Sequence, residues 1–343
     1  MRASLFPQRA SRLFPWGLRR TRLVARQQSR PVHWRHLPKA LTPTENSYDS
    51  FGTFTGSVLP GGEGASIIYT GVTKVSKERE TIRNEGLREV QCIATSMDPD
   101  LRTWRKLDKP VIEAPPAGAK IVGFRDPFSW KDEDTWYAGV GSGFEHQGGV
   151  VLLYRSKDAR NWEYLHPLAE GTWNGQLVSN PGGSGEMWEC PDFFPLGDKH
   201  VLIHSTAHNV YWDVGVFDKR ELRFHSEKTG LLDHGAYYAP RSMLDGKNRR
   251  ILWGWVQETR PPEESKAAGW ASAMSLPRVL TLGSGNELQM EVPPEFASPR
   301  HRGDARTSDP GETGQAVSQG HSSQPRGRGD LQVQANRERH VRA

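Results

Sequence analysis

Two stretches of the chain, ATSMDPDLRTWRKL at residues 94–107 and YRSKDARNWEYL at residues 154–165, share one pattern. Each contains Ser-x-Asp, then a polar turn, then Trp-x-x-Leu. RPVHWRHLP at residues 30–38 matches the end of this pattern, so the shared tryptophans are separated by 70 and 58 residues. Such intervals accommodate a four-stranded sheet with its connections, which is the unit of a β-propeller. A chance similarity among aromatic hairpins is the alternative.

Short apolar or aromatic runs lie around these repeats and are bounded by clusters that contain Gly, Asp or Pro. The runs are IIYTGV (67–72), TWYAGV (135–140), GVVLLYR (149–155), HVLIHST (200–206) and RILWGWV (250–256). No segment combines a long helical periodicity with capping residues. The pattern therefore predicts an all-β fold.

Charge is distributed unevenly along the 343 residues. Residues 1–44 contain nine Arg and one Lys but no Asp or Glu, and residues 297–343 contain eight Arg against five acidic residues. Because the formal net charge of the whole chain is only +5, residues 45–296 are acidic overall. An acidic domain offers no electrostatic surface for phosphates, so we expect no nucleic-acid partner.

The two ends also differ in composition from the rest of the chain. The tail, residues 297–343, has no aromatic side chain and is rich in Gly, Ser, Gln, Arg and Pro, so we expect it to be disordered. The head, residues 1–29, lacks the apolar region of a secretory signal, and we expect it to be disordered as well. The predicted folded domain is thus residues 30–296.

Signals for membranes, metals and disulfides are weak. The mean hydropathy is −0.68, and no apolar run approaches the length of a transmembrane helix, so no membrane partner is expected. Cys92 and Cys190 give neither a disulfide framework nor a metal motif, and the twelve histidines show no metal-ligand spacing. We therefore expect no metal and no other cofactor. Both the cytoplasm and secretion stay open as locations.

Two segments place charged residues inside apolar surroundings. In IVGFRDPFSW (121–130), Arg125 and Asp126 precede a proline, and in MWECPDFFPL (187–196) Glu189 precedes Cys-Pro. Each proline is expected to end its strand. Either segment alone is typical of a turn with a solvated acid. Together, one blade apart and flanked by aromatic residues, they indicate a sugar site, in which rings stack on apolar faces and carboxylates hold hydroxyls and transfer protons.

Two further features have simpler interpretations. Tyr237 and Tyr238, before Ala-Pro, are more typical of core residues at a strand end than of a funnel lining. PPEES at residues 261–265 is expected to be a solvated loop.

The two charged segments resemble motifs of glycoside hydrolase family 32, which contains invertases, levanases and inulinases. FRDP is similar to the family's Arg-Asp-Pro motif and WECPD to its Glu-Cys motif. The similarity runs from about Arg30 to Pro294 and includes YDSFGTFTGS, YYAP, RILWGWVQE and GWASAMSLPRVL in the expected order. The resemblance implies a five-bladed β-propeller, a retaining β-fructofuranosidase mechanism, and sucrose or a fructan as substrate.

The resemblance also assigns roles to residues. It implies that Glu189 is the acid/base and that Asp126 stabilises the transition state through the fructosyl hydroxyls. The other substrate-binding residues that it implies are Arg125, Phe54, Ser57 and Cys190. Of these, Cys190 would lie beside Glu189 and hydrogen-bond with it.

The family's nucleophile is the aspartate of a Trp-Met-Asn-Asp-Pro-Asn-Gly motif on the first blade, and this motif is missing. No Asp or Glu precedes Glu45, and Asp49 belongs to YDSFG, which matches a different motif. We therefore expect an incomplete first blade, no nucleophile and at most trace activity. The family's C-terminal β-sandwich is likewise expected to be absent. Arg-rich ends of this kind are typical of an altered reading frame, while a transit peptide would explain the head alone.

Alternative functions stay open. A non-catalytic sugar-binding propeller would keep the aromatic pocket and Asp126 but perform no chemistry. A fructosyltransferase would transfer the fructosyl group to a sugar, and its acceptor loops would decide this. A structural or interaction propeller would need only the strands and would leave FRDP and WECPD unexplained. A small sugar or fructan is the expected partner, and the oligomeric state is left open.

Overall fold

The computed structural model describes residues 2–8, 22–30, 33–61, 64–80, 82–83, 86–175 and 185–296, with side chains from residue 38 onward. Met1–Ser298 form one compact unit. Apart from two single-turn 3-10 helices and the short helix α1 (Pro262–Ala268), the regular structure described is β-strand, so the all-β prediction is confirmed. The tail predicted to be disordered lies outside the described residues.

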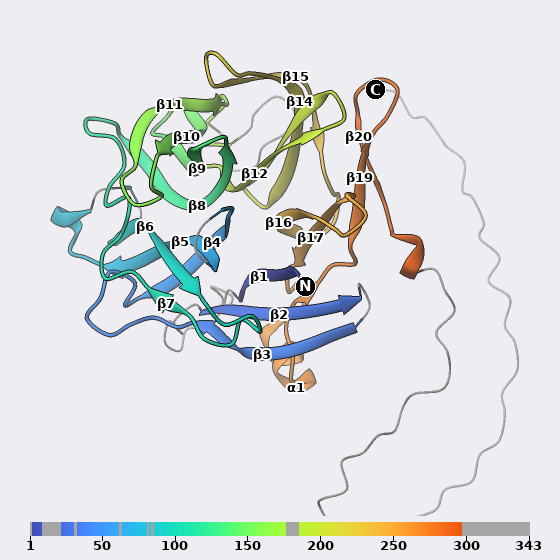
Figure 1. The fold of residues 1–343 in the computed structure, drawn as a ribbon, viewed down its shortest axis with the longest axis horizontal. Coiled ribbons are helices and arrows are strands. Elements are labelled where there is room, and N and C mark those ends of the chain that lie inside the picture. Colours follow the sequence, from blue (N-terminus) through green and yellow to red (C-terminus); the bar gives the residue numbers. More distant parts are fainter. Residues whose placement is uncertain are drawn as a thin grey trace, which may run out of the picture. The chain divides into compact units, whose positions relative to one another are not determined.

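Four antiparallel sheets follow one another along the chain (Figure 1). The first contains β4 (Gly52–Leu59), β5 (Ala65–Lys74), β6 (Leu87–Ser96) and β7 (Arg105–Lys106). The second contains β8 (Ile121–Asp132), β9 (Thr135–Phe144), β10 (Gly148–Ser156) and β11 (Glu163–Glu170). The third contains β12 (Glu189–Leu196), β13 (Lys199–Thr206), β14 (Asn209–Asp218) and β15 (Arg223–Leu231). The fourth contains β16 (Tyr237–Leu244), β17 (Arg250–Val256), β18 (Ala273–Met274), β19 (Arg278–Leu282) and β20 (Leu288–Glu291).

The sheets are the blades of a β-propeller, because their faces pack on one another in order. Apolar side chains fill the space between consecutive sheets, such as Ile68 and Val140 between the first and second, and Leu153 and Leu202 between the second and third. A middle strand is therefore covered on both faces. This explains why residues 148–154 of β10 are buried without the alternation of a one-sided strand. The predicted propeller is confirmed for these four blades.

The sequence repeat corresponds to one local structure. The indole Nε1 of Trp104 donates to the Leu101 carbonyl at 3.0 Å, and that of Trp162 donates to the Ala159 carbonyl at 3.1 Å. In each copy the repeated aspartate accepts hydrogen bonds from backbone N–H groups of its own turn. The repeat is thus the connection between the third and fourth strands of a blade. The third copy, at Trp34, lies where side chains are outside the described part.

A further sheet precedes the four blades. It contains β1 (Arg2–Gln8), β2 (Arg22–Arg30) and β3 (His33–Leu41), and β1 and β2 contact β4. The prediction of a disordered head differs from the structure in β1 and β2. Strand pairing uses backbone N–H and C=O groups, which a basic sequence possesses like any other. Leu41, at the end of β3, is buried against Ile67 and Tyr69 of the first blade.

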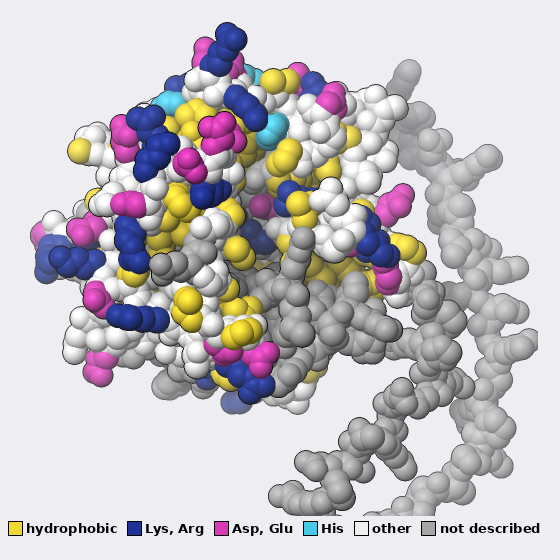
Figure 2. All heavy atoms as spheres, in the orientation of Figure 1, with side chains coloured by type: hydrophobic (Ala, Val, Ile, Leu, Met, Phe, Trp, Pro, Cys, Tyr) yellow, Lys and Arg dark blue, Asp and Glu magenta, His cyan; other side chains and the backbone are white. Residues whose placement is uncertain are grey.

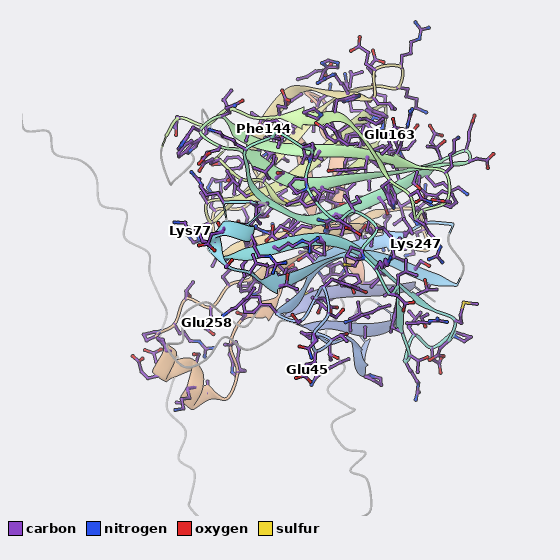
Figure 3. The ribbon with its side chains drawn as sticks, turned by 90° about the vertical axis from the view of Figure 1, so that its left-hand side faces the viewer. Glu45, Lys77, Phe144, Glu163, Lys247 and Glu258 are labelled. Carbon is purple, nitrogen blue, oxygen red and sulfur yellow. The ribbon has the colours of Figure 1, made fainter. Side chains whose placement is uncertain are left out.

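The innermost strands of the four blades, β4, β8, β12 and β16, lie beside one another in succession. Each begins at the same face of the blades and ends at the opposite face. Figure 3 shows both faces from the side: Phe144, which pairs with the first residue of β8, labels one, and Lys247, just beyond the end of β16, labels the other. We call them the Phe144 face and the Lys247 face.

Every innermost strand has a bulge at the same level. The register shifts fall between Thr53 and Gly56, Arg125 and Phe128, Glu189 and Asp192, and Tyr238 and Arg241. In the last three bulges, a residue with positive φ (62°, 49° and 50°) is followed by proline. The prediction that Pro127 and Pro191 end their strands is therefore wrong. An innermost strand pairs on one side only, so a proline in its bulge costs no hydrogen bond of the ladder.

The prediction of a loop at residues 261–265 is wrong for all but the first of them. Pro261 precedes α1, which begins at Pro262 and ends before Gly269 with φ 74°. Proline suits the first turn of a helix and glycine its left-handed end, although the segment's residues are largely exposed, as expected.

Candidate functional site

The bulges bring three side chains from successive blades together near the Phe144 face. Arg125 donates from Nε and Nη2 to Glu189 Oε1 at 3.0 and 2.8 Å, and the Tyr238 hydroxyl donates to Glu189 Oε2 at 2.6 Å. These three residues occupy the same position, immediately before the bulge, in β8, β12 and β16. The prediction that FRDP and WECPD lie one blade apart is confirmed.

A second carboxylate lies on the other side of Arg125. Glu89 of β6 is fully buried and accepts from Arg125 Nη1 at 3.0 Å and from the Phe124 N–H at 2.6 Å. Burial alone would lower the pKa of Arg125, but the carboxylates of Glu89 and Glu189 outweigh it and raise this pKa well above its usual value. Arg125 is therefore a permanent cation between two carboxylates, and it fixes the position of Glu189.

Asp126 is fully buried beside this group and has one unoccupied oxygen. Its Oδ2 accepts from the N–H of Cys190 at 3.0 Å and from the Cys190 thiol at 3.3 Å. Its own N–H donates to Thr70 Oγ1 at 2.9 Å. Asp126 Oδ1 is buried and has no hydrogen-bond partner among the residues described. A buried carboxylate oxygen of this kind is costly unless a ligand completes it.

Backbone strain accompanies the site. Asp126, Cys190 and Ala239 have positive φ although each is a non-glycine residue before proline, which normally favours extended backbone. Such conformations cost on the order of 1–3 kcal/mol each and persist where the surroundings enforce them, as at active sites. Here they turn the preceding side chains toward one another.

Cys190, Phe54 and Ser57 are the other residues predicted to bind substrate. Only Cys190 and Phe54 lie within the bulges. Cys190 donates from its N–H and its thiol to Asp126, and its thiol also donates to Thr55 Oγ1 at 3.9 Å. Phe54 lies in the bulge of β4, at the level of the site. Ser57 lies beyond that bulge and lines a cavity toward the Lys247 face, so the structure does not bring it to Glu189.

Asp49 is fully buried, but its carboxylate is already occupied. It accepts from the Thr44 N–H at 3.0 Å, from the Tyr69 hydroxyl at 3.2 Å and from Lys106 Nζ. These donors hold it in the first blade as a structural group, in agreement with the interpretation of YDSFG.

Two residues of the site, Tyr238 and Glu89, were not among the site residues predicted from the sequence. The assignment of Tyr237 and Tyr238 to the core is confirmed, since both are buried between the third and fourth blades, but the hydroxyl of Tyr238 also contacts Glu189. The sequence contained an indication for Tyr238, since Tyr-Ala-Pro repeats the pattern of Arg-Asp-Pro and Glu-Cys-Pro. Glu89 had the same signal as Glu189: an acid inside an apolar strand.

The arrangement defines a class of protein. Figure 2 looks onto the Lys247 face, opposite to this group, and shows a hollow between the blades there. Two carboxylates of different blades, one aligned by arginine and tyrosine and one with a free acceptor, are suited to bind hydroxyls and transfer a proton in a propeller of the glycosidase type. Within the described ranges, no group of three His, Cys, Asp or Glu side chains could hold a metal ion. The same residues contain no helix long and apolar enough to cross a membrane.

Comparison with known proteins identifies the family. The sequence model described as the glycosyl hydrolases family 32 N-terminal domain matches residues 27–292. The chain belongs to glycoside hydrolase family 32, as the sequence motifs predicted.

Individual relatives agree with this membership. The chain is 35% identical to the sucrose-6-phosphate hydrolase of Escherichia coli over 275 residues, which are 76% of this chain and 54% of that protein. Among solved structures, the β-fructofuranosidase of Bombyx mori matches with a TM-score of 0.66 at 30% identity, over 80% of this chain and 56% of that one. Fructan 1-exohydrolase IIa of Cichorium intybus matches with a TM-score of 0.68 at 27% identity, over 83% and 55%. The chain thus spans about half the length of these relatives.

Proposed function

We propose that the protein is a β-fructofuranosidase-type propeller that binds the terminal fructosyl unit of sucrose or a fructan at the Phe144 face. The observation that carries this proposal is Asp126 Oδ1, a buried acceptor without a described partner next to the aligned Glu189. In this role Asp126 accepts hydrogen bonds from fructosyl hydroxyls. Glu189 protonates the glycosidic oxygen as it leaves. Solved relatives have been obtained with sucrose and with 1-kestose, which supports this substrate class.

The retaining mechanism of the family needs a nucleophile in addition to an acid/base. The 44 residues before Glu45 contain no carboxylate, and Asp49 is engaged by three donors. We therefore expect a polypeptide of these 343 residues to bind the sugar and to release at most traces of fructose. Rapid release of fructose from sucrose or 1-kestose would contradict this expectation.

Binding is measured by isothermal titration calorimetry with sucrose and 1-kestose. Saturable binding is expected, and Asp126→Asn should weaken it at least tenfold, because a hydrogen bond to a charged group contributes about 1.5–3 kcal/mol. Asp132→Asn, on the exposed end of the same strand, is the matched control and should bind like the unmodified protein. Absence of saturable binding, or equal binding by both variants, would overturn the proposal.

The acid role of Glu189 is tested with sucrose and azide as an external nucleophile. Azide attacks the anomeric carbon of the fructosyl unit, and the bond from that carbon to the glycosidic oxygen breaks. The electron pair stays on the oxygen, which takes its proton from Glu189, so the products are fructosyl azide and glucose. Azide should restore glucose release in the unmodified chain and should fail to do so in Glu189→Gln.

Two related functions have support of their own. The lack of a carboxylate in residues 1–44 favours a sugar-binding propeller, for which binding without any rescue by azide would be the result. The sucrose:sucrose 1-fructosyltransferase of Festuca arundinacea is 34% identical over 73% of this chain and 40% of its own length, which supports transfer to a sugar acceptor. Kestose formation from sucrose distinguishes transfer from hydrolysis.

The proposal also includes a fifth blade of the propeller. We infer that the sheet of β1–β3 takes the place of a fifth, incomplete blade, because β1 and β2 contact β4 and Leu41 packs on the first described blade.

A further inference from the structure

A cavity of about 940 Å³ opens between the blades on the Lys247 face. It is lined by the parts of β4, β8, β12 and β16 that follow the bulges, including Ser57, Phe128, Asp192 and Arg241. Glu189 and Tyr238 precede the bulges, so this cavity is separate from the candidate sugar site. Its volume is that of a small-molecule site.

The walls of the cavity are largely apolar. Trp130 and Phe193 contribute aromatic rings, while Val58 and Met97 expose 54% and 73% of their surface. Large exposed apolar residues on one cavity favour a ligand with an apolar or ring-shaped body.

One wall carries the positive charge of Arg250, which forms no direct ion pair with any described residue. The Arg250 side chain forms no hydrogen bond with any described residue, and its Nε is buried. Its guanidinium lies 4.5 Å from the ring of Phe194. Burial lowers the pKa of Arg250, with Asp192 opposing this effect at longer range. A half-buried guanidinium without an ion-pair partner is unusual, since arginines in such places are normally paired.

Neighbouring groups add donors on the same wall. Ser242 Oγ is buried without a described partner. Arg241 donates to the carbonyls of Pro191, Asp126 and Pro127, and among the described residues it forms no ion pair with a carboxylate. Arg241, Ser242 and Arg250 thus line one cavity, with Asp192 as the acidic residue of the lining nearest to them in the chain's described part.

The acidic residues of the lining are occupied by other donors. Asp192 Oδ2 accepts from the Ser242 N–H at 2.7 Å. Asp98 accepts from the N–H groups of Asp100 and Arg102, and Asp100 lies 3.6 Å from the Arg102 guanidinium. These acids leave the Arg250 wall available to an external anion.

We propose that this cavity is a binding site for a small organic anion, whose carboxylate or phosphate pairs with Arg250 and Ser242 while its ring packs against Trp130 and Phe193. Arginine binds both anionic groups through its planar set of N–H donors. The site is independent of fructosyl binding, because it uses other residues on the other face of the blades.

The test uses benzoate and phenyl phosphate as probes, with benzyl alcohol as the uncharged counterpart, and measures binding to the full chain by calorimetry. At least one anionic probe should bind with a Kd of about 1 mM or tighter, and added salt should weaken it. Arg250→Gln should weaken this binding at least tenfold. This variant loses no hydrogen bond of the fold, whereas Arg241→Gln would release three carbonyls and is less suited as the first test.

Two control variants separate this site from others. Arg155→Gln removes an exposed arginine that pairs with Glu163, and Glu189→Gln alters the candidate sugar site; both should bind the anionic probes normally. The proposal is overturned if neither probe saturates the protein, if benzyl alcohol binds equally well, or if Arg250→Gln has no larger effect than Arg155→Gln. Failure of sucrose binding would contradict the proposed function and leave these results unaffected.

Discussion

The hydroxyl of Tyr238 lies 2.6 Å from Oε2 of Glu189, although the two residues belong to different blades. Each stands immediately before the bulge of its innermost strand, and Arg125 stands at the same position of a third blade. One local distortion, repeated in successive blades, thus directs three polar side chains to one point. Glu189 is held from both sides, by a cation and by a neutral donor.

The bond between Tyr238 and Glu189 should matter for the sugar site. Tyr238→Phe removes this donor without changing the size of the ring, and we expect sucrose to bind about tenfold more weakly, since a hydrogen bond to a charged group is lost. Calorimetry measures the affinity. Tyr237→Phe is the control because the adjacent tyrosine lies in the core, and equal affinities of the two variants would show that the contact is unimportant.

Arg125 should stabilise the folded protein as well as position Glu189. Arg125→Met leaves the fully buried Glu89 without its ion-pair partner, which should reduce the free energy of unfolding by about 3–5 kcal/mol. Urea denaturation followed by tryptophan fluorescence measures this loss. The double variant Arg125→Met, Glu89→Gln should recover part of the stability, because the fully buried side chain at position 89 then carries no charge. A double variant as unstable as the single one would contradict this explanation.

The strands were predictable from the sequence because their local patterns are strong. Aromatic and β-branched runs between turn residues mark strands, and the repeated Ser-x-Asp and Trp mark one turn in each of two blades. The bulges were not predictable in the same way. Proline is normally read as the end of a strand, and only the one-sided pairing of an innermost strand allows Pro127 and Pro191 to lie within it.

The site residues that are charged and belong to a recognisable motif were predictable, as Glu189 and Asp126 show. Glu89 was missed because its role depends on Arg125, which lies in another blade and is 36 residues away in sequence. Tyr238 was missed because an aromatic residue at a strand end is usually buried. Tyr238 is buried too, and only the direction of its hydroxyl gives it a role.

Lys106 should stabilise the first blade through Asp49. Its Nζ pairs with the fully buried carboxylate, which also accepts from Thr44 and Tyr69. Lys106→Met should therefore lower the free energy of unfolding by about 3–5 kcal/mol, as expected when one partner of a buried pair is removed. Arg155→Met breaks the exposed pair with Glu163 and should cost less than about 1 kcal/mol in the same urea experiment. Similar losses in both variants would contradict the structural role of Asp49.

His200 should make the stability of the protein depend on pH. Burial lowers its pKa from the usual value of 6.5, and the charge of Lys219 lowers it further. The half-buried ring stacks on Phe193 with ring centroids 5.2 Å apart. Since the unfolded chain takes up the proton more readily than the folded chain, the stability is fully present above pH 6.5 and falls as the pH drops through the lower folded pKa.

Urea denaturation at about pH 7.5 and about pH 5 measures this dependence. The unmodified protein should be less stable at the lower pH, and His200→Gln should reduce the difference, because its side chain cannot be protonated. His208→Asn, at an exposed turn, is the control and should keep the full difference. If His200→Gln shows the same pH dependence as the unmodified protein, proton uptake at His200 does not contribute to the unfolding equilibrium.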